Sequence, residues 1–200
     1  NEYFNRIPAI NQPITIEVSV GTNYFFEIAK LRALRLLFNT LSAEYNHNFD
    51  CHIIATPTKR NKTLYDYNVN MLRTTTECMS AILGGADAVA NLAYDAIYHK
   101  DNEFGDRISR NQLLVLKHES YFDKVNNPAD GAYYIETLTE QLAEKALELF
   151  KDIEKNGGLI SQLIDGTIQR KINESAQKEQ ELFDSGKEVL LGTNKYPNKN

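Results

Sequence analysis

Four histidines and their acidic neighbours are the residues of this sequence best suited to acid–base or metal chemistry. His99 lies among charged residues in the segment YHKDNE, and His118 immediately precedes Glu119 in the segment KHES. A metal ion needs several convergent ligands, and general acid–base catalysis needs groups in hydrogen-bond reach of the reacting atom. The local sequence supplies neither, so we interpret these histidines, and also His47 and His52, as solvated loop and helix-end residues.

Three other groups of residues favour structural interpretations. Gly84-Gly85 lacks the spacing of phosphate-binding loops and predicts the end of a helix. The segment TKRNK (58–62) places three basic residues after a predicted strand, where they could approach an anionic group or remain in solvent. Cys51 and Cys78 lack metal-ligand spacing and predict two buried, reduced thiols in a cytosolic protein. Since no Ser-His-Asp or Cys-His arrangement is readable either, we assign no catalytic residue and no metal ligand.

The elements that would position these residues alternate between strand and helix. Alternating β-rich residues predict a strand at 14–20, and apolar residues at three- and four-residue steps predict a helix at 22–45. A strand at 51–56, a helix at 68–83 and a third strand around 88–93 follow. Each connection is long enough for a crossover, so we expect the strands to be parallel.

The remainder of the chain is mainly helical. A loop marked by Gly105 precedes a predicted helix at 107–120, and the turn-rich NNPADGAY precedes a longer helix that ends at Gly157-Gly158. The apolar face of this longer helix comprises Leu138, Leu142, Ala146, Leu149 and Ile153. One last amphipathic helix, carrying Leu163, Ile172 and Ala176, precedes a short strand and a polar tail. Three βα units suit half of a (β/α)8 barrel or a small doubly wound sheet, and the long C-terminal helices favour the barrel.

The composition argues against several classes of protein. A chain of 200 residues with 42% hydrophobic residues can bury a core, as one domain or as a piece of a larger one. Its net charge of −5 argues against a nucleic-acid partner. No run approaches the roughly 18 apolar residues of a membrane span, and no signal peptide opens the chain. We therefore expect a cytoplasmic protein, and the start at Asn1, without Met and close to a strand, suggests a cut within a longer protein.

Six sequence blocks together resemble the adenosylcobalamin-dependent methylmalonyl-CoA mutases. They are GTNYFFEIAKLRALR, NMLRTTTECMSAILGGADAV, RISRNQ, HES, NPADGAYYIETLTEQLAEKA and SGKEVLLGTNKY, in family order from about Ile14 to Tyr196. The resemblance implies an α/β fold, the C-terminal part of a (β/α)8 TIM-type barrel with parallel strands, followed by long helices. Residues 1–125 would be the later βα units and 126–200 the C-terminal helices and tail of the same domain. The N-terminal barrel half and the flavodoxin-like cobalamin-binding domain have no counterpart in this sequence.

The departures from the family lie where its catalytic chains carry their chemistry. By resemblance, the histidine of a His-Thr-Asn motif that lies against the corrin falls at Ala90, and the asparagine falls at Leu92. A His-Cys-Gln-Thr-Ser-Gly motif falls on residues 54–59, Ile-Ala-Thr-Pro-Thr-Lys, and is almost entirely lost. After the matching residues Arg107, Arg110 and Asn111, the resemblance places a glutamine of the family at position 113, where this sequence has leucine. Glu119 matches a corrin-proximal glutamate, so we expect a vestigial cofactor-binding position there.

Positions of the family's scaffold are retained, by contrast. They are Glu27, Lys30, Arg32, Arg73, Glu77, Arg107, Arg110 and Tyr133, which the resemblance assigns to salt bridges and packing. This pattern resembles the small, non-catalytic subunit of the heterodimeric bacterial enzyme. It implies a catalytic large subunit as the partner, with adenosylcobalamin and acyl-CoA bound only through the complex, which interconverts methylmalonyl-CoA and succinyl-CoA through a radical formed by cobalt–carbon homolysis. Two alternatives stay open: a catalytically active acyl-CoA mutase chain with a rebuilt pocket, and an unrelated half-barrel binding module.

Overall fold

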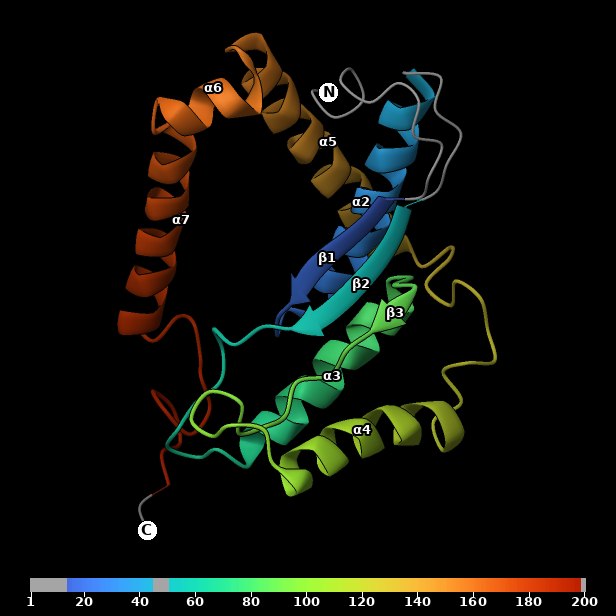
Figure 1. The fold of residues 1–200 in the computed structure, drawn as a ribbon, viewed down its shortest axis with the longest axis vertical. Coiled ribbons are helices and arrows are strands. Elements are labelled where there is room, and N and C mark those ends of the chain that lie inside the picture. The colour runs from blue at the N-terminus through green and yellow to red at the C-terminus, as the bar shows by residue number, and fades with distance from the viewer. Residues whose placement is uncertain (1–13, 45–50, 199–200) are drawn as a thin grey trace.

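The computed structural model describes residues 14–44 and 51–198 as a parallel sheet with helices packed on one side (Figure 1). The sheet has three strands, β1 (Ile14–Val20), β2 (Cys51–Pro57) and β3 (Ala88–Val89), in the order β1-β2-β3. Strand β1 pairs with β2 along its whole length, from Ile14 opposite Cys51 to Val20 opposite Pro57. The predicted α/β class with parallel strands is confirmed, and the arrangement is consistent with part of a TIM-type barrel.

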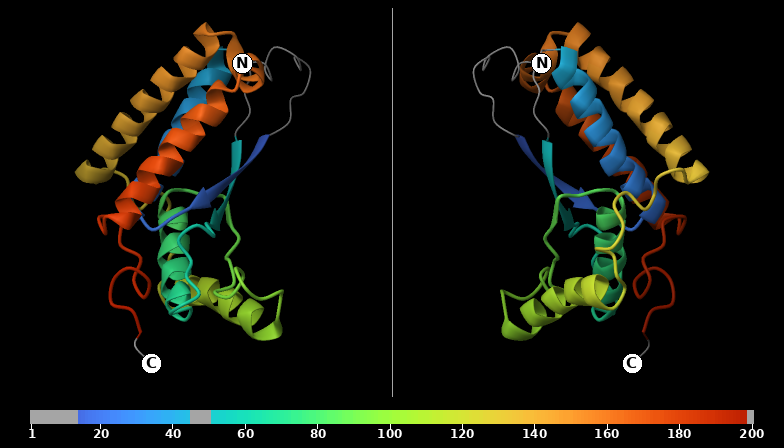
Figure 2. Two further views of the ribbon diagram at one scale, coloured as in Figure 1. Left: turned by 90° about the vertical axis from the view of Figure 1, so that its left-hand side faces the viewer. Right: turned by 90° about the vertical axis from the view of Figure 1, so that its right-hand side faces the viewer.

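The described part of the chain contains six helices. They are α2 (Tyr24–Glu44), α3 (Val69–Leu83), α4 (Glu103–His118), α5 (Tyr133–Lys155), α6 (Gly158–Ile164) and α7 (Thr167–Asp184). Helices α2 and α3 lie against the sheet, and α5 packs on the outer side of α2 (Figure 2). The central core joins Val20, Leu31, Ile53, Ala55 and Ala81, all of which are fully buried.

The opposite face of the sheet is uncovered in the part of the chain that the structure describes. Side chains alternate along β1 and β2, so that Thr15, Glu17, Ser19 and His52 are exposed while their neighbours are buried or half-buried. Parallel sheets are almost always covered on both faces. An uncovered polar face therefore indicates a surface that further structure normally covers.

The third strand is shorter than predicted, because a polar side chain diverts the chain after two residues. The Ala90 N–H still donates to the carbonyl of Ala55 (2.9 Å). The Asn91 amide then donates to Gln112 Oε1 (2.9 Å) and to the carbonyl of Ser109 (2.9 Å), both on α4. These bonds draw the chain away from the sheet, so the predicted strand at 88–93 is replaced by β3 and a loop.

The interpretation of Gly105 as a loop residue was wrong, since α4 begins at Glu103. Asn102 caps this helix by accepting a hydrogen bond from the Gly105 N–H (2.8 Å). A Cβ atom at position 105 would lie 2.6 Å from Oδ1 of the buried Asp95. Glycine is therefore needed here for close approach to a carboxylate, within the first turn of the helix.

The C-terminal part also differs from the prediction. The single amphipathic helix expected after Gly157-Gly158 is divided into α6 and α7 by Gly166, whose φ is 74°. The expected final strand is reduced to an isolated bridge between Leu191 and Lys195. The buried residues of α5 are Ile135, Leu138, Thr139 and Ala143, so the predicted face that includes Ala146 and Leu149 is only partly correct. His47 and the first thirteen residues lie outside the described residues.

Candidate functional site

A cavity of about 590 Å³ lies where β1 and β2 end, between the loops that follow them and the C-terminal segment. Its walls include Ser19 near the end of β1 and Gly21 and Thr22 after it, Thr58, Arg60 and Asn61 after β2, and Glu27 and Arg73 from α2 and α3. The C-terminal part contributes Ala176, Glu179, Gln180, Phe183, Glu188, Val189 and Leu190. The carboxyl ends of parallel strands are the place where α/β barrels and open sheets bind ligands. This cavity is therefore the candidate site.

A buried ion pair supports the wall of the cavity. Lys62 donates to both carboxylate oxygens of Glu77, at 3.0 and 2.8 Å, and the two side chains are 1% and 0% exposed. Burial lowers the pKa of Lys62 and raises the pKa of Glu77, and each partner opposes the shift of the other. Asn61 joins the pair by accepting from Lys62 (2.6 Å) and donating to Glu77 (2.5 Å). The loop after β2 is thus fixed to α3 by fully bonded polar groups.

A second polar cluster connects α3 with the C-terminal segment. The guanidinium of Arg73 donates to Asn70 Oδ1 (2.9 Å) and to the carbonyl of Leu191 (2.6 Å). The Asn70 amide donates to the carbonyls of Thr63 (2.9 Å) and Tyr94 (3.0 Å). Burial lowers the pKa of Arg73, against the pull of nearby carboxylates. Three loops that are distant in sequence are therefore held together around one helix.

Three of the charged residues that line the cavity form ion pairs. Arg60 forms an ion pair with Glu179 of α7 at 2.5 Å, and Glu27 pairs with Lys30 one turn along α2. No histidine or cysteine is among the lining residues. Hydroxyl, amide and paired ionic groups can hold a polar molecule by hydrogen bonds, but no lining side chain has the arrangement of an activated nucleophile or an acid–base pair.

In the segment TKRNK (58–62), the structure differs from the sequence interpretation at one residue, Lys62. Arg60 is exposed and bound to Glu179, but Lys62 is buried against Glu77 instead of lying in solvent or binding an external anion. Spacing in α3 carried a signal for this burial: Asn70, Arg73 and Glu77 recur at three- and four-residue steps and so share one helix face. A polar face at this spacing indicates buried polar partners when the same face meets the core.

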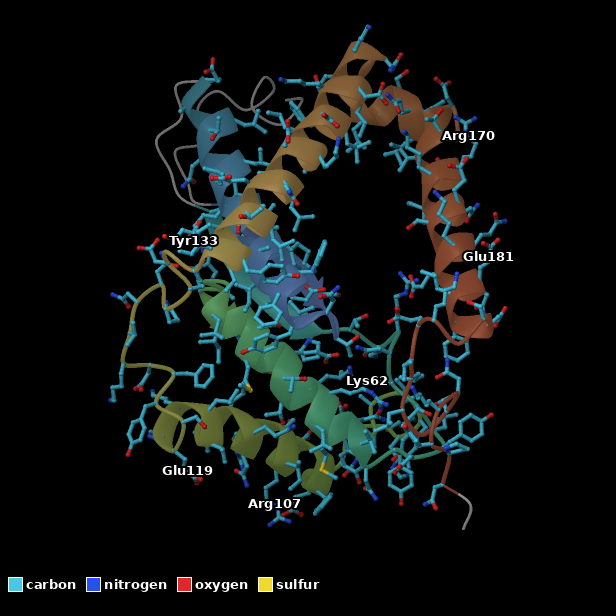
Figure 3. The ribbon with its side chains drawn as sticks, turned by 180° about the vertical axis from the view of Figure 1, so that it is seen from behind. Lys62, Arg107, Glu119, Tyr133, Arg170 and Glu181 are labelled. Atoms are coloured by element: carbon cyan, nitrogen blue, oxygen red, sulfur yellow. The ribbon has the colours of Figure 1, made fainter. Side chains whose placement is uncertain are left out.

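The positions that replace the family motifs lie at the same end of the sheet. Thr58 lines the cavity, whereas Ala90 and Leu92, an exposed and a half-buried residue just after β3, do not. Glu119 also lies outside the cavity: it is the exposed residue after α4, on the side of the molecule away from α7 (Figure 3). The structure thus brings Thr58 to the candidate site but does not bring Glu119 to it.

The histidines are surface residues wherever the structure describes them. His52, His99 and His118 are exposed. His99 lies 3.4 Å from the buried Asp95 and against the ring of Tyr98, and Asp95 also accepts a hydrogen bond from Asn102 (2.7 Å). Within residues 14–44 and 51–198, no group of three or more histidine, cysteine, aspartate and glutamate side chains could hold a metal ion. None of the helices in these ranges is long and apolar enough to cross a bilayer.

The retained scaffold positions divide into two sets. Glu27, Lys30, Arg32, Arg73 and Glu77 form ion pairs or buried hydrogen bonds within the chain, including Arg32 with Glu136 of α5 at 2.6 Å. Arg107, Arg110 and Tyr133 are exposed instead, Tyr133 to 92%. Figure 3 shows Arg107 and Tyr133 among them. The guanidinium of Arg107 lies over the ring of Phe104, 5.5 Å from its centroid. The first set stabilises this fold, and the second is placed on its surface.

A family model described as methylmalonyl-CoA mutase matches residues 7–200 of this chain. Among curated proteins, the chain is 42% identical over 190 residues to the methylmalonyl-CoA mutase small subunit of Porphyromonas gingivalis, covering 92% of this chain and 31% of that protein. It is 37% identical over 183 residues to the methylmalonyl-CoA mutase of Rhizobium meliloti, covering 89% and 26%.

A relative named as the other type of subunit is also similar. The probable methylmalonyl-CoA mutase large subunit of Mycobacterium bovis is 33% identical over 181 residues, which cover 88% of this chain and 24% of that protein. The chain therefore spans less than a third of the length of these relatives.

Proposed function

Since the chain belongs to the methylmalonyl-CoA mutase family, we propose that it is part of a small, non-catalytic subunit that supports a catalytic large subunit. In this role it would contribute the later βα units of a barrel and would not itself carry out the interconversion of methylmalonyl-CoA and succinyl-CoA. The relative with 42% identity bears the name of a small subunit, which supports this choice.

The observation that carries the proposal is the chemistry of the strand ends. Ala90 supplies a methyl group where catalytic chains of the family have, by resemblance, an imidazole against the corrin. Thr56, Pro57 and Thr58 replace the Gln-Thr-Ser of the preceding strand. Barrel enzymes place their reacting groups at these carboxyl ends. The loss of these reacting groups favours a supporting role for this chain, and so does the presence of ion pairs that stabilise the fold.

Adenosylcobalamin would supply the radical chemistry of the assembled enzyme, but the residues of this chain do not fit its catalytic site. No histidine lines the cavity, and two of its charged residues, Arg60 and Glu179, are bound to each other. We therefore derive no step of the reaction from this chain. Glu119, the exposed residue after α4, remains a proposed vestigial contact, for which the resemblance is the support.

The proposed location is the cytoplasm, and the proposed partner is the large subunit. Both cysteines are buried, reduced thiols, as expected in a reducing compartment. The uncovered face of the sheet would be covered by the remaining βα units of the same barrel, and exposed residues such as Tyr133 offer contact surface for a second subunit.

The proposal is tested with the complete protein that carries these residues and a family large subunit. We expect the two to co-elute in size-exclusion chromatography, with turnover present only when the large subunit is present. The small subunit alone should leave the absorbance spectrum of added cobalamin unchanged. Stoichiometric cobalamin binding by the small subunit alone, or turnover without the large subunit, would support the catalytic alternative instead.

Glu119→Ala provides a residue-level test in the same complex. Because Glu119 is exposed and outside the cavity, we expect turnover within about twofold of the parent, the range of a surface substitution. Lys117→Ala, an exposed change on the same helix end, is the matched control. A tenfold or greater loss confined to Glu119→Ala would assign that carboxylate a catalytic role and contradict the proposal.

A further inference from the structure

Helices α6 and α7 are attached to the rest of the fold in an unusual way. None of the residues of α7 is buried, and among the described elements it packs substantially only against α6. Glycines with left-handed φ angles flank it: Gly166 (74°) is its N-cap, and Gly186 (70°) follows its C-cap Ser185. Gly157 (98°) precedes α6. Glycine adopts such angles without steric cost, so these positions can act as hinges between rigid helices.

The segment that follows α7 returns to the cavity and binds tightly there. The Leu191 carbonyl accepts from Arg73 (2.6 Å), and the hydroxyls of Thr193 and Thr63 lie 2.6 Å apart. Between them is Gly192, with φ of 81°, where a Cβ atom would lie 2.6 Å from the Cβ of Asp66. We call residues 158–195, which comprise α6, α7 and the segment after them, the arm. Residues 190–195 at its end are called the clasp, because they hold the arm against the loop after β2.

The clasp is organised by its own hydrogen bonds. Asn194 accepts from the Leu190 N–H (2.8 Å) and donates to the Glu188 carbonyl (2.8 Å) and the Phe183 carbonyl (3.3 Å). The Gly192 N–H donates to the Lys195 carbonyl (2.8 Å). Since these bonds lie within residues 183–195, the clasp can leave the loop as a formed unit, losing its hydrogen bonds to Arg73 and Thr63 and its contact with Asp66.

One ion pair joins the middle of the arm to the opposite wall of the cavity. Arg60 and Glu179 are 66% and 52% exposed, so the pair is screened by solvent and contributes little to stability. The arm contributes much of the cavity wall, through Ala176, Glu179, Gln180, Phe183, Glu188, Val189 and Leu190.

We propose that α6, α7 and the clasp (residues 158–195) form a hinged lid that opens and closes access to the cavity at the strand ends. The closed state is the one described, with the clasp bound and Arg60 paired with Glu179. In the open state the clasp leaves Thr63 and Arg73, and the arm turns about Gly157 and Gly166. This proposal does not depend on the proposed function, because it concerns access to the cavity in this chain alone.

The test measures access to one residue beneath the lid in the protein as it exists. Thr58 is half-buried and lines the cavity, so Thr58→Cys places a thiol there. The native thiols give a low background, since Cys51 is buried and burial raises the pKa of Cys78 to about 12. The rate of labelling by a maleimide then reports lid opening, with Thr137→Cys on the exposed side of α5 as the matched control.

Two further substitutions are combined with Thr58→Cys. We expect Gly192→Ala, which introduces backbone strain and a contact with Asp66, to accelerate labelling about tenfold by favouring local opening. Thr193→Val, which removes only the hydroxyl contact with Thr63, should also accelerate labelling and covers the case in which Gly192→Ala does not fold. Labelling of Thr137→Cys should be unaffected by either change.

Loss of the ion pair gives an independent prediction. Arg60→Gln should accelerate labelling of Thr58→Cys roughly two- to fivefold, the range expected for one exposed pair, and salt should accelerate the parent toward the same rate. The proposal is overturned if the clasp substitutions leave the labelling rate unchanged in a folded protein. It is overturned equally if Thr58→Cys in the parent reacts as fast as the Thr137→Cys control.

Discussion

At the scale of single residues, the buried pair of Lys62 and Glu77 is a feature at which one substitution should be costly. Two full charges with almost no exposure are stable only when each is fully hydrogen-bonded, and Asn61 supplies the additional bonds. Removing one partner leaves the other charge buried without compensation. The pair therefore makes the loop after β2 sensitive to single substitutions.

We expect Glu77→Gln to lower the free energy of unfolding by about 3–5 kcal/mol, as breaking a buried ion pair does. Urea unfolding followed by far-UV circular dichroism measures this change. The matched control is Glu17→Gln on the exposed face of β1, which should alter stability by no more than about 0.5 kcal/mol. Equal effects of the two substitutions would show that the ion pair does not stabilise the fold.

Asp87 provides a prediction on pH dependence. Desolvation opposes ionisation of this carboxylate, but the Ile53 N–H (2.8 Å) and Arg35 (2.7 Å) outweigh it, so the pKa is lowered from 3.8. A lowered carboxylate pKa gives stability that is present above the unfolded-state value and is lost as pH falls through the folded value. Asp87 should therefore contribute to stability at neutral pH and lose that contribution below about pH 4.

The substitution Asp87→Asn tests this sign. We expect the variant to be less stable than the parent at pH 7, and the difference between them to shrink between about pH 4 and pH 2. Urea midpoints measured across this pH range provide the comparison. Asp101→Asn, a change at an exposed position of the loop before α4, is the matched control and should alter stability at pH 7 by no more than about 0.5 kcal/mol. A difference that grows on acidification would contradict the assignment.

At the scale of elements, the packing of α5 on α2 determines where the C-terminal helices begin. Ile28 of α2 forms a buried cluster with Ala129 and Ile135, and the ion pair between Arg32 and Glu136 lies beside it. Leu138 continues this buried face along α5, whereas the far end of the helix extends into solvent. The first half of α5 therefore belongs to the core, and its second half extends away from the core and leads into α6.

Two leucine substitutions on this helix should have clearly different effects. Leu138 is 8% exposed, so Leu138→Ala should cost about 2–4 kcal/mol of unfolding free energy through lost burial and a cavity. Leu149 is 47% exposed, and Leu149→Ala should cost less than about 1 kcal/mol. Chemical denaturation of both variants measures the contrast. Similar costs would mean that the distal half of α5 is packed as tightly as the proximal half.

At the scale of the whole molecule, the described chain has one complete side and one open side. Helices cover only one face of the parallel sheet (Figure 2). Exposed apolar side chains on other parts of the described surface include Tyr133 and Ile164. The relatives are more than three times as long as the matched region. These features support the proposed place of the chain within a larger barrel and a two-subunit assembly, which the co-elution and turnover experiment tests.

The sequence by itself determined the class of fold and the order of the main elements. Alternation at 14–20 and the three- and four-residue spacing of α2, α3 and α5 directly reflect which face of each element leaves water. The family was also predictable, because six blocks in order are a specific signal, and the family model confirms it. Which apolar residues are buried depends on their spacing within each helix or strand, and this spacing can be read directly from a single sequence.

Only the tertiary structure decided which polar residues meet. Lys62 and Glu77, Arg32 and Glu136, and Arg60 and Glu179 are separated by up to 119 residues, so nothing in their local sequence specifies the pairs. The same reason explains the short β3, which ends because Asn91 binds α4, and the glycine at 105, which is required by the distant carboxylate of Asp95. Hydrogen bonds and ion pairs depend on distances of a few ångströms between elements, and folding sets those distances.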